Sequence, residues 1–155
     1  MSRKRISKIE NFMEVAETVA KRSHDEETQV GAVLIKNDSS AIIATGYNGF
    51  VRGAPDDKLP AIRPHKYEYM LHAEQNLIFN CAKHGISTEN TTLVCTHSPC
   101  KLCMRMLFNC GIKKVIVKNL YRDWQEILLM DDIAVDYNFT PSTGYYHLVY
   151  LVQKP

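Results

Sequence analysis

The feature that most constrains this chain is a short histidine motif that is followed, farther along, by a cysteine pair. The first motif is His72-Ala73-Glu74, and the second is Pro99-Cys100-Lys101-Leu102-Cys103. His72, Cys100 and Cys103 are candidate zinc ligands, and Glu74 is a carboxylate that is poorly placed to be a fourth. Structural zinc sites are usually closed by four protein ligands, whereas catalytic sites keep a position for water. Three ligands with a free acid therefore indicate a site that activates water.

Hydrophobic periodicity places both motifs at the starts of helices. Helices are expected over residues 7–22, 71–83, 99–109 and 121–130. Strands are expected over residues 29–35, 41–45, 92–96, 114–117, 133–137 and 146–152, and the segment 46–66 is expected to be a long loop. The order of the later elements implies crossover connections and a mixed sheet covered by helices on both faces, which is an α/β fold. The positive end of a helix dipole at Cys100 would favour a thiolate there.

Composition excludes only a few functional classes of protein. A chain of 155 residues fits one domain, residues 1–155, and a net charge of +2 is too small to imply nucleic-acid binding through electrostatics alone. No run approaches the ~18 apolar residues that cross a bilayer, and no apolar signal core follows the basic start. We therefore expect a cytoplasmic protein with no membrane and no stable nucleic-acid partner. Five cysteines argue against a fully paired disulfide framework, so Cys81, Cys95 and Cys110 are expected to be buried free thiols.

Each half of the metal pattern is weaker than the whole. A lone Cys-x-x-Cys could be a redox pair or half of a structural zinc site, for which Cys95, His97 and His84 are nearby fourth ligands. Together, the two motifs match H-x-E…P-C-x-x-C, the established signature of zinc nucleobase deaminases. In such a site, zinc activates a water that attacks a ring carbon, and Glu74 carries the protons.

Further segments extend this pattern well beyond the metal ligands. They are Arg22-Ser23-His24-Asp25, Gln29-Val30-Gly31-Ala32, Gly46-Tyr47-Asn48-Gly49-Phe50, Asp56-Asp57-Lys58-Leu59-Pro60, Lys66-Tyr67-Glu68-Tyr69 and Gly111-Ile112-Lys113-Lys114-Val115-Ile116. From about Phe12 to Val117 the chain resembles the deoxycytidylate (dCMP) deaminases, within the zinc-dependent cytidine/deoxycytidylate deaminase superfamily, and the similarity loosens from Lys118 on. The resemblance implies a cytidine deaminase-like three-layer α/β/α fold with a mixed central sheet of about five strands. It also implies hydrolytic conversion of dCMP to dUMP and ammonia, which supplies dUMP for thymidylate synthesis.

The resemblance also assigns residues to the substrate. Asn48 would contact the nucleotide sugar, the Ala73 amide would hold the base carbonyl, and the Ser98 carbonyl would receive the exocyclic amine. Tyr121 would form a wall for the base. For the phosphate, Arg22 and Ser23 are the candidates, and the competing cations of the long loop are Arg52, Arg63 and Lys66.

The resemblance implies regulation and assembly as well. It predicts activation by dCTP, inhibition by dTTP, Mg²⁺ with the bound triphosphate, and a homo-oligomer, commonly a hexamer. Arg52, Asp56 and Asp57 are the candidate effector residues. Some relatives bind a second, structural zinc near this loop, but here the loop holds no cysteine and His65 is its only histidine. One zinc per subunit is therefore expected.

Three other functions stay open at this point. A free cytidine or deoxycytidine deaminase would share the chemistry and need no phosphate pocket. A polynucleotide deaminase of the tRNA adenosine type would need a basic or aromatic groove for flanking nucleotides. A zinc-stabilised, non-catalytic assembly module would have no use for Glu74.

Overall fold

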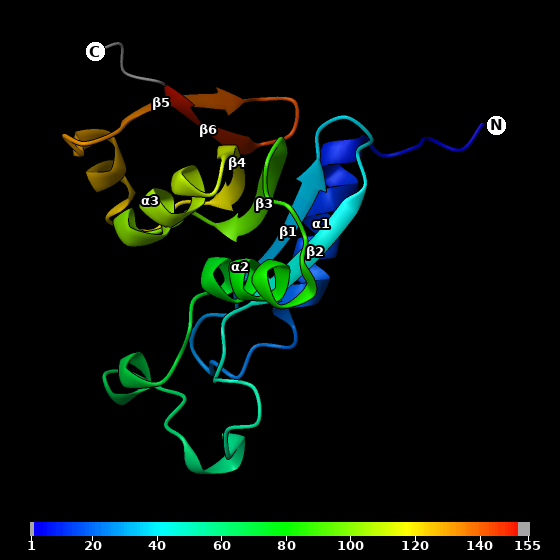
Figure 1. The fold of residues 1–155 in the computed structure, drawn as a ribbon. Coiled ribbons are helices and arrows are strands. Elements are labelled where there is room, and N and C mark those ends of the chain that lie inside the picture. Colours follow the sequence, from blue (N-terminus) through cyan, green and yellow to red (C-terminus); the bar gives the residue numbers. More distant parts are fainter. Residues whose placement is uncertain (1, 152–155) are drawn as a thin grey trace.

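One mixed sheet forms the centre of the protein. The computed structural model describes residues 2–151, in which six strands lie in the order β2-β1-β3-β4-β6-β5 (Figure 1). The strands are β1 (Gly31–Lys36), β2 (Ile42–Tyr47), β3 (Thr91–His97), β4 (Ile112–Asn119), β5 (Ala134–Thr140) and β6 (Tyr145–Leu151). β3 and β4 are parallel, and every other neighbouring pair is antiparallel. The expected mixed sheet is confirmed, but the count of about five is one too low because residues 134–151 form a complete hairpin.

Helices cover both faces of this sheet. They are α1 (Lys8–Ala20), α2 (Ala73–His84) and α3 (Lys101–Asn109). Met13 and Ala16 of α1 pack with Val33 of β1 in one apolar core, whereas the cores of α2 and α3 lie on the opposite face (Figure 1). The three layers predicted from the sequence are therefore confirmed.

A glycine allows α1 to approach the sheet closely. A Cβ on Gly31 would lie 1.9 Å from the carbonyl oxygen of Ala16, so any larger residue would push the helix away from β1. The Gly31-Ala32 sequence at the start of β1 thus sets how closely α1 packs against the sheet.

The expected fourth helix over residues 121–130 is wrong in type. The chain forms a 3₁₀ segment there, η3 (Trp124–Leu129), and Asp123 at its start makes no side-chain cap bond. By contrast, Ser7 caps α1 by accepting a hydrogen bond from the Glu10 N–H at 3.1 Å. Side-chain caps of this kind stabilise the starts of α-helices, and runs of 3₁₀ geometry are usually short.

A long loop leaves the sheet after β2 and returns at α2. Gly46 and Tyr47, expected in this loop, still belong to β2, and the loop contains two short turns, η1 (Asp56–Lys58) and η2 (His65–Glu68). Its neck is closed by two backbone hydrogen bonds between Gly49 and Leu71, of 3.1 and 2.8 Å. Figure 1 shows the loop projecting from one end of the layers.

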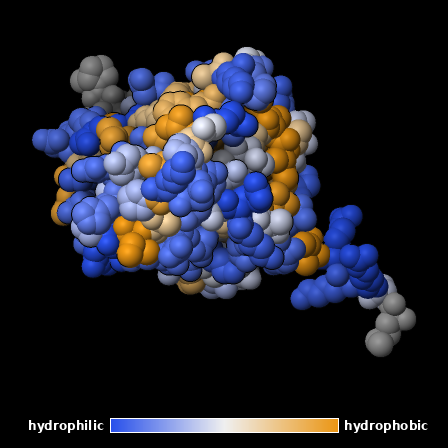
Figure 2. Space-filling view, turned by 90° about the horizontal axis from the view of Figure 1, so that it is seen from below, coloured by the Kyte–Doolittle hydropathy of each residue, from blue (hydrophilic) through white to orange (hydrophobic). Residues whose placement is uncertain are grey.

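The surface at this end is mostly polar. Figure 2, which views the molecule from below Figure 1, shows a largely hydrophilic face with hydrophobic residues scattered over it. Val51, Ile62 and Tyr67 are apolar loop residues that are more than half exposed. Within residues 2–151, no helix combines the length and the apolar character needed to cross a membrane.

Candidate metal centre and catalytic site

The three predicted zinc ligands come together at the starts of two helices. His72 is the N-cap of α2 and Cys100 is the N-cap of α3, as expected from the sequence. The Nδ1 of His72 lies 3.7 Å from the Sγ of Cys100 and 3.4 Å from the Sγ of Cys103. Tetrahedral zinc with its usual bond lengths separates nitrogen and sulfur ligands by about 3.6 Å. The donor set and its spacing therefore fit zinc.

Local hydrogen bonds hold these donors in place. The Cys100 sulfur accepts from the Cys103 N–H at 3.4 Å, and the Gln75 Oε1 accepts from the His72 N–H at 2.8 Å. In the described part of the chain, the cluster of potential ligand atoms contains only His72, Cys100 and Cys103. Cys95, His97 and His84, the candidate fourth ligands of a closed structural site, are not in it.

The two cysteines of the centre have unequal proton affinities. A hydrogen bond from Cys103 lowers the pKa of Cys100 to about 4, and the same contact raises the pKa of Cys103. The hydrogen bond to Cys100 also raises the pKa of His72. A lowered pKa favours the thiolate at Cys100, which is the form that coordinates metals, and a bound zinc ion would hold both sulfurs as thiolates.

Glu74 lies beside the donors and is almost completely buried, with 4% of its surface exposed. Burial raises the pKa of this carboxyl above its usual range. The Sγ of Cys95, itself fully buried, lies 3.6 Å from the Glu74 Oε1 and donates to it. A buried carboxyl with a raised pKa next to a metal site can accept and return protons, as a general acid and base must.

Three of the expected substrate contacts follow from the same helix and strand ends. Ala73 is the first residue of α2, where a backbone N–H has no partner within the helix. Ser98 is buried directly after β3, and its Oγ accepts from the Tyr121 N–H at 2.9 Å. The Tyr121 ring is 41% exposed and stacks on the His97 ring, with centroids 5.2 Å apart. Ala73 and Ser98 are therefore within two residues of the ligands His72 and Cys100, and a hydrogen bond joins Tyr121 to Ser98.

Asn48 and Ser23 meet at the neck of the long loop. The Asn48 Oδ1 accepts from the Val30 N–H, its Nδ2 donates to the Thr28 carbonyl, and both distances are 2.9 Å. The Ser23 Oγ donates to the Asn48 carbonyl at 2.7 Å. A carbonyl oxygen has two lone pairs, so the Asn48 Oδ1 can still accept from a sugar hydroxyl. Arg22, one residue before Ser23, is exposed.

The cations of the long loop are mostly committed to protein partners. Lys66 is buried with 3% of its surface exposed, and its Nζ lies 2.7 and 3.0 Å from the two carboxylate oxygens of Asp25. Arg63 donates to the Tyr67 hydroxyl at 2.8 Å. A phosphate would have to displace these contacts, so Lys66 is a poor phosphate ligand.

Within the described residues, none of the candidate effector residues belongs to the cluster of metal ligands. Arg52 donates to the Asn80 Oδ1 of α2 at 3.3 Å, and the Asp56 Oδ2 lies 3.0 Å from the His24 Nε2. Asp57 is exposed on η1. Arg52 and Asp56 thus tie the loop to the body of the protein.

Sequence reasoning missed the environment of Glu74 and Asn48. Cys95 was expected as a buried thiol or as the fourth ligand of a structural zinc site, and His97 only as such a fourth ligand. Cys95 and His97 lie on the same face of β3 as Leu93, which packs in the core with α2 and α3. Because side chains alternate along a strand, the sequence could have predicted that both residues face these helices. Cys81 is buried as expected, but Cys110 is only half-buried because it ends α3.

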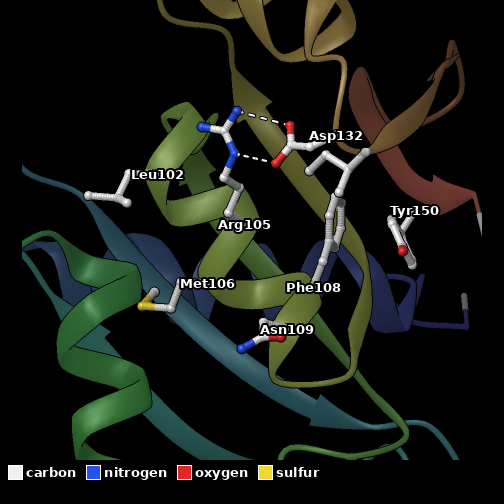
Figure 3. A pocket seen from close by; sticks show the side chains of 8 residues that line it. Leu102, Arg105, Met106, Phe108, Asn109, Asp132 and Tyr150 are labelled. Atoms are coloured by element: carbon white, nitrogen blue, oxygen red, sulfur yellow. Dashed lines mark hydrogen bonds and ion pairs between the residues drawn. The ribbon is translucent and has the colours of Figure 1, made fainter.

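A separate hollow lies on the outer side of α3. It has a volume of about 450 Å³ and is lined by Arg105, Phe108, Asp132 and Tyr150, among others (Figure 3). Arg105 spans it with two hydrogen bonds to Asp132, of 2.6 and 2.9 Å. None of the zinc donors lines it. The metal centre and this hollow are therefore different places.

Metal donors at two helix starts, a buried carboxyl beside them and a three-layer α/β scaffold define a metal-dependent hydrolytic site. Comparison with known proteins specifies the class. Residues 6–119 match the family described as the cytidine and deoxycytidylate deaminase zinc-binding region. The chain is 37% identical over 145 residues to a deoxycytidylate deaminase of Pongo abelii, covering 86% of this chain and 80% of that protein.

Other relatives agree. A human deoxycytidylate deaminase is 37% identical over 124 residues, covering 76% of this chain and 68% of that protein. The crystal structure of dCMP deaminase from the cyanophage S-TIM5 in complex with dCMP and dUMP is 34% identical, with a TM-score of 0.65 over 77% of this chain and 88% of that one. The chain belongs to the zinc-binding cytidine and deoxycytidylate deaminase family, and its cytidine deaminase-like fold is confirmed.

Proposed function

We propose that this protein deaminates dCMP by hydrolysis, giving dUMP and ammonia. The observation that carries the proposal is the buried Glu74 carboxyl beside the donors His72, Cys100 and Cys103. Relatives that are named for dCMP support the choice of nucleotide. The product would supply thymidylate synthesis.

The proton transfers fall to Glu74. Zinc held by His72, Cys100 and Cys103 would lower the pKa of a bound water toward ~7 and so supply the nucleophile at neutral pH. Glu74 takes the proton of the attacking water and passes it to the ring nitrogen of cytosine. It then carries the second proton of the water to the departing amine, which leaves as ammonia. Its burial fits this role, since a raised pKa makes a carboxyl able to return a proton.

The proposed substrate contacts are those that the family resemblance implies. The Ala73 N–H donates to the base carbonyl, the Ser98 carbonyl accepts from the exocyclic amine, and Tyr121 covers the base. Asn48 binds the sugar through the free lone pair of its Oδ1. Arg22 and Ser23 meet the phosphate. The commitment of Lys66 to Asp25 supports the exposed Arg22 over this competitor.

The proposal extends to regulation and assembly. One zinc binds per subunit of a single deaminase domain, residues 1–155, in a cytoplasmic homo-oligomer, commonly a hexamer. dCTP with Mg²⁺ activates the enzyme and dTTP inhibits it, through a site that includes Arg52, Asp56 and Asp57. The support is the family resemblance and the exposure of these three residues on the loop.

The test compares substrates in one assay. Ammonia release is measured with dCMP, deoxycytidine, CMP and a cytosine-containing oligonucleotide, each with and without dCTP–Mg²⁺ or dTTP. We expect dCMP to be the best substrate and both triphosphates to change its turnover. Turnover of deoxycytidine at least as fast as that of dCMP would reject the substrate, and a flat response to the triphosphates would reject the regulation.

A further inference from the structure

Two oppositely charged side chains are buried against each other at the neck of the long loop. Asp25 has 6% of its surface exposed and Lys66 has 3%. The Lys66 Nζ contacts both Asp25 carboxylate oxygens, at 2.7 and 3.0 Å, and lies 3.4 Å from the Glu27 Oε1. The remaining ion pairs of residues 2–151 involve exposed or half-exposed side chains, such as Lys118 with Glu17. Since removing two charges from water is costly, a buried pair is weak evidence for stability and calls for another explanation.

The pair is connected to Asn48 by hydrogen bonds. The Asp25 Oδ1 accepts from the Thr28 N–H at 3.0 Å, which shapes the turn whose Thr28 carbonyl accepts from the Asn48 Nδ2 at 2.9 Å. The Asp25 Oδ2 also lies 3.4 Å from the same Nδ2. With both of its protons directed at acceptors, the Asn48 amide can rotate little. Its Oδ1 is thereby turned toward the Val30 N–H.

The pair is also connected to the metal centre through the chain. Lys66 is in the loop that returns to α2, and the Gly49–Leu71 bridge joins the residue after Asn48 to the residue before His72. Through its contacts with Asp25, Lys66 therefore holds the returning segment of the loop against the turn that contacts Asn48. The Asp25–Lys66 pair thus joins the turn that holds Asn48 to the loop segment that leads to His72, although these segments are far apart in the sequence.

We propose that Asp25 and Lys66 form a positioning pair that orients Asn48 for the nucleotide sugar. The inference rests on the proposed function, because it takes a nucleotide as the ligand of Asn48. Neither side chain touches the reacting atoms. Their effect is on nucleotide binding, so KM rises when the pair is lost while turnover at saturation and zinc content stay close to those of the wild type.

The experiment is a double-mutant cycle of Lys66→Met and Asn48→Ala, with Lys118→Met as the matched control, because Lys118 forms an exposed pair with Glu17 at 2.6 Å. Asp25→Asn/Lys66→Met is the second variant, since it leaves no unpaired buried charge if Lys66→Met alone folds poorly. Zinc content, Tm, kcat and KM for dCMP are measured for each protein. Amide hydrogen exchange at Val30 is measured as well, because its N–H donates to Asn48.

We expect Lys66→Met and the charge-free double variant to raise KM by about tenfold or more with kcat changed by less than about threefold. In the Asn48→Ala background, Lys66→Met should raise KM no further than about twofold. Val30 exchange should accelerate in both pair variants and stay unchanged in Lys118→Met.

Two results would overturn the proposal. One is wild-type exchange at Val30 in both pair variants, because Asn48 would then be held without the pair. The other is a full, additive rise in KM in the Asn48→Ala background, because the pair would then act by another route. If the wild-type protein does not turn over dCMP at all, the proposed function fails, and the exchange at Val30 still decides whether the pair orients Asn48.

Discussion

The start of α3 and its outer side differ in how their polar groups are arranged. At its start, the Cys100 sulfur, the His72 ring and the Glu74 carboxyl converge, and Glu74 is buried. On its outer side, the hollow of Figure 3 is spacious, but its two charged groups, Arg105 and Asp132, face each other in contact with solvent. Charges that neutralise each other have little left to offer a ligand. The functional part of α3 is marked by converging polar groups of different kinds and not by the volume of a hollow.

Removing one of the metal ligands should have the largest effect. Cys103→Ala leaves two zinc ligands, so we expect the zinc content after dialysis to fall well below that of the wild type and turnover to fall to background. Cys110→Ala is the matched control, because Cys110 lies at the other end of α3 outside the donor cluster. Metal analysis and ammonia release check both variants. Full zinc loading of Cys103→Ala would show that the cluster is not the metal site.

Replacing the proton carrier should come next in size. Glu74→Gln keeps the shape of the side chain but cannot carry protons, so we expect a loss of about 10²–10⁴-fold in kcat with zinc retained. Glu126→Gln makes the same change at an exposed carboxylate near Lys101 and should be silent. Steady-state kinetics on zinc-loaded proteins measure the difference. Substantial activity in zinc-loaded Glu74→Gln would assign proton transfer to another group.

The positions of the metal ligands and of Glu74 were also the part of the site that the sequence could predict. His72 and Cys100 are N-caps, and caps depend on local sequence, so their positions follow from short-range rules. Six strands and three of the four helices were likewise anticipated to within a few residues, although Val152 of the last expected strand lies outside the described residues.

The contacts between distant segments could not be predicted in the same way. Lys66 looks like a solvated loop cation because nothing near it in the sequence indicates Asp25, 41 residues away. The expected α-helix over residues 121–130 was wrong because the local pattern does not determine the type of helix. An apolar period is compatible with several helical geometries, so the pattern over residues 121–130 does not by itself distinguish an α-helix from a 3₁₀ segment.

A smaller effect is expected from the thiol that contacts Glu74. Cys95→Val removes the Sγ donor at 3.6 Å from the Glu74 Oε1 while filling the same buried space. Since one hydrogen bond contributes about 1 kcal/mol net, we expect kcat to fall by about two- to fivefold. Cys95→Ser supplies a hydroxyl donor in place of the thiol and should recover most of this loss. Equal kcat values for Cys95→Val and the wild type would mean that the thiol only fills space.

The smallest effect is expected on the outer side of α3. Arg105→Met breaks the ion pair with Asp132, in which both side chains are more than 40% exposed. Many exposed ion pairs contribute nothing measurable, so Tm should shift little, and kcat and KM for dCMP should match those of the wild type.

The Arg105 guanidinium lowers the pKa of Asp132, so any stability from the pair is present above the unfolded-state pKa of this carboxyl. It is lost as the pH falls through the lower folded-state pKa. Thermal unfolding of both proteins from pH 7 down to about pH 3 measures this. A change in KM for dCMP in Arg105→Met would place the hollow in the functional region and undo the contrast between the start of α3 and its outer side.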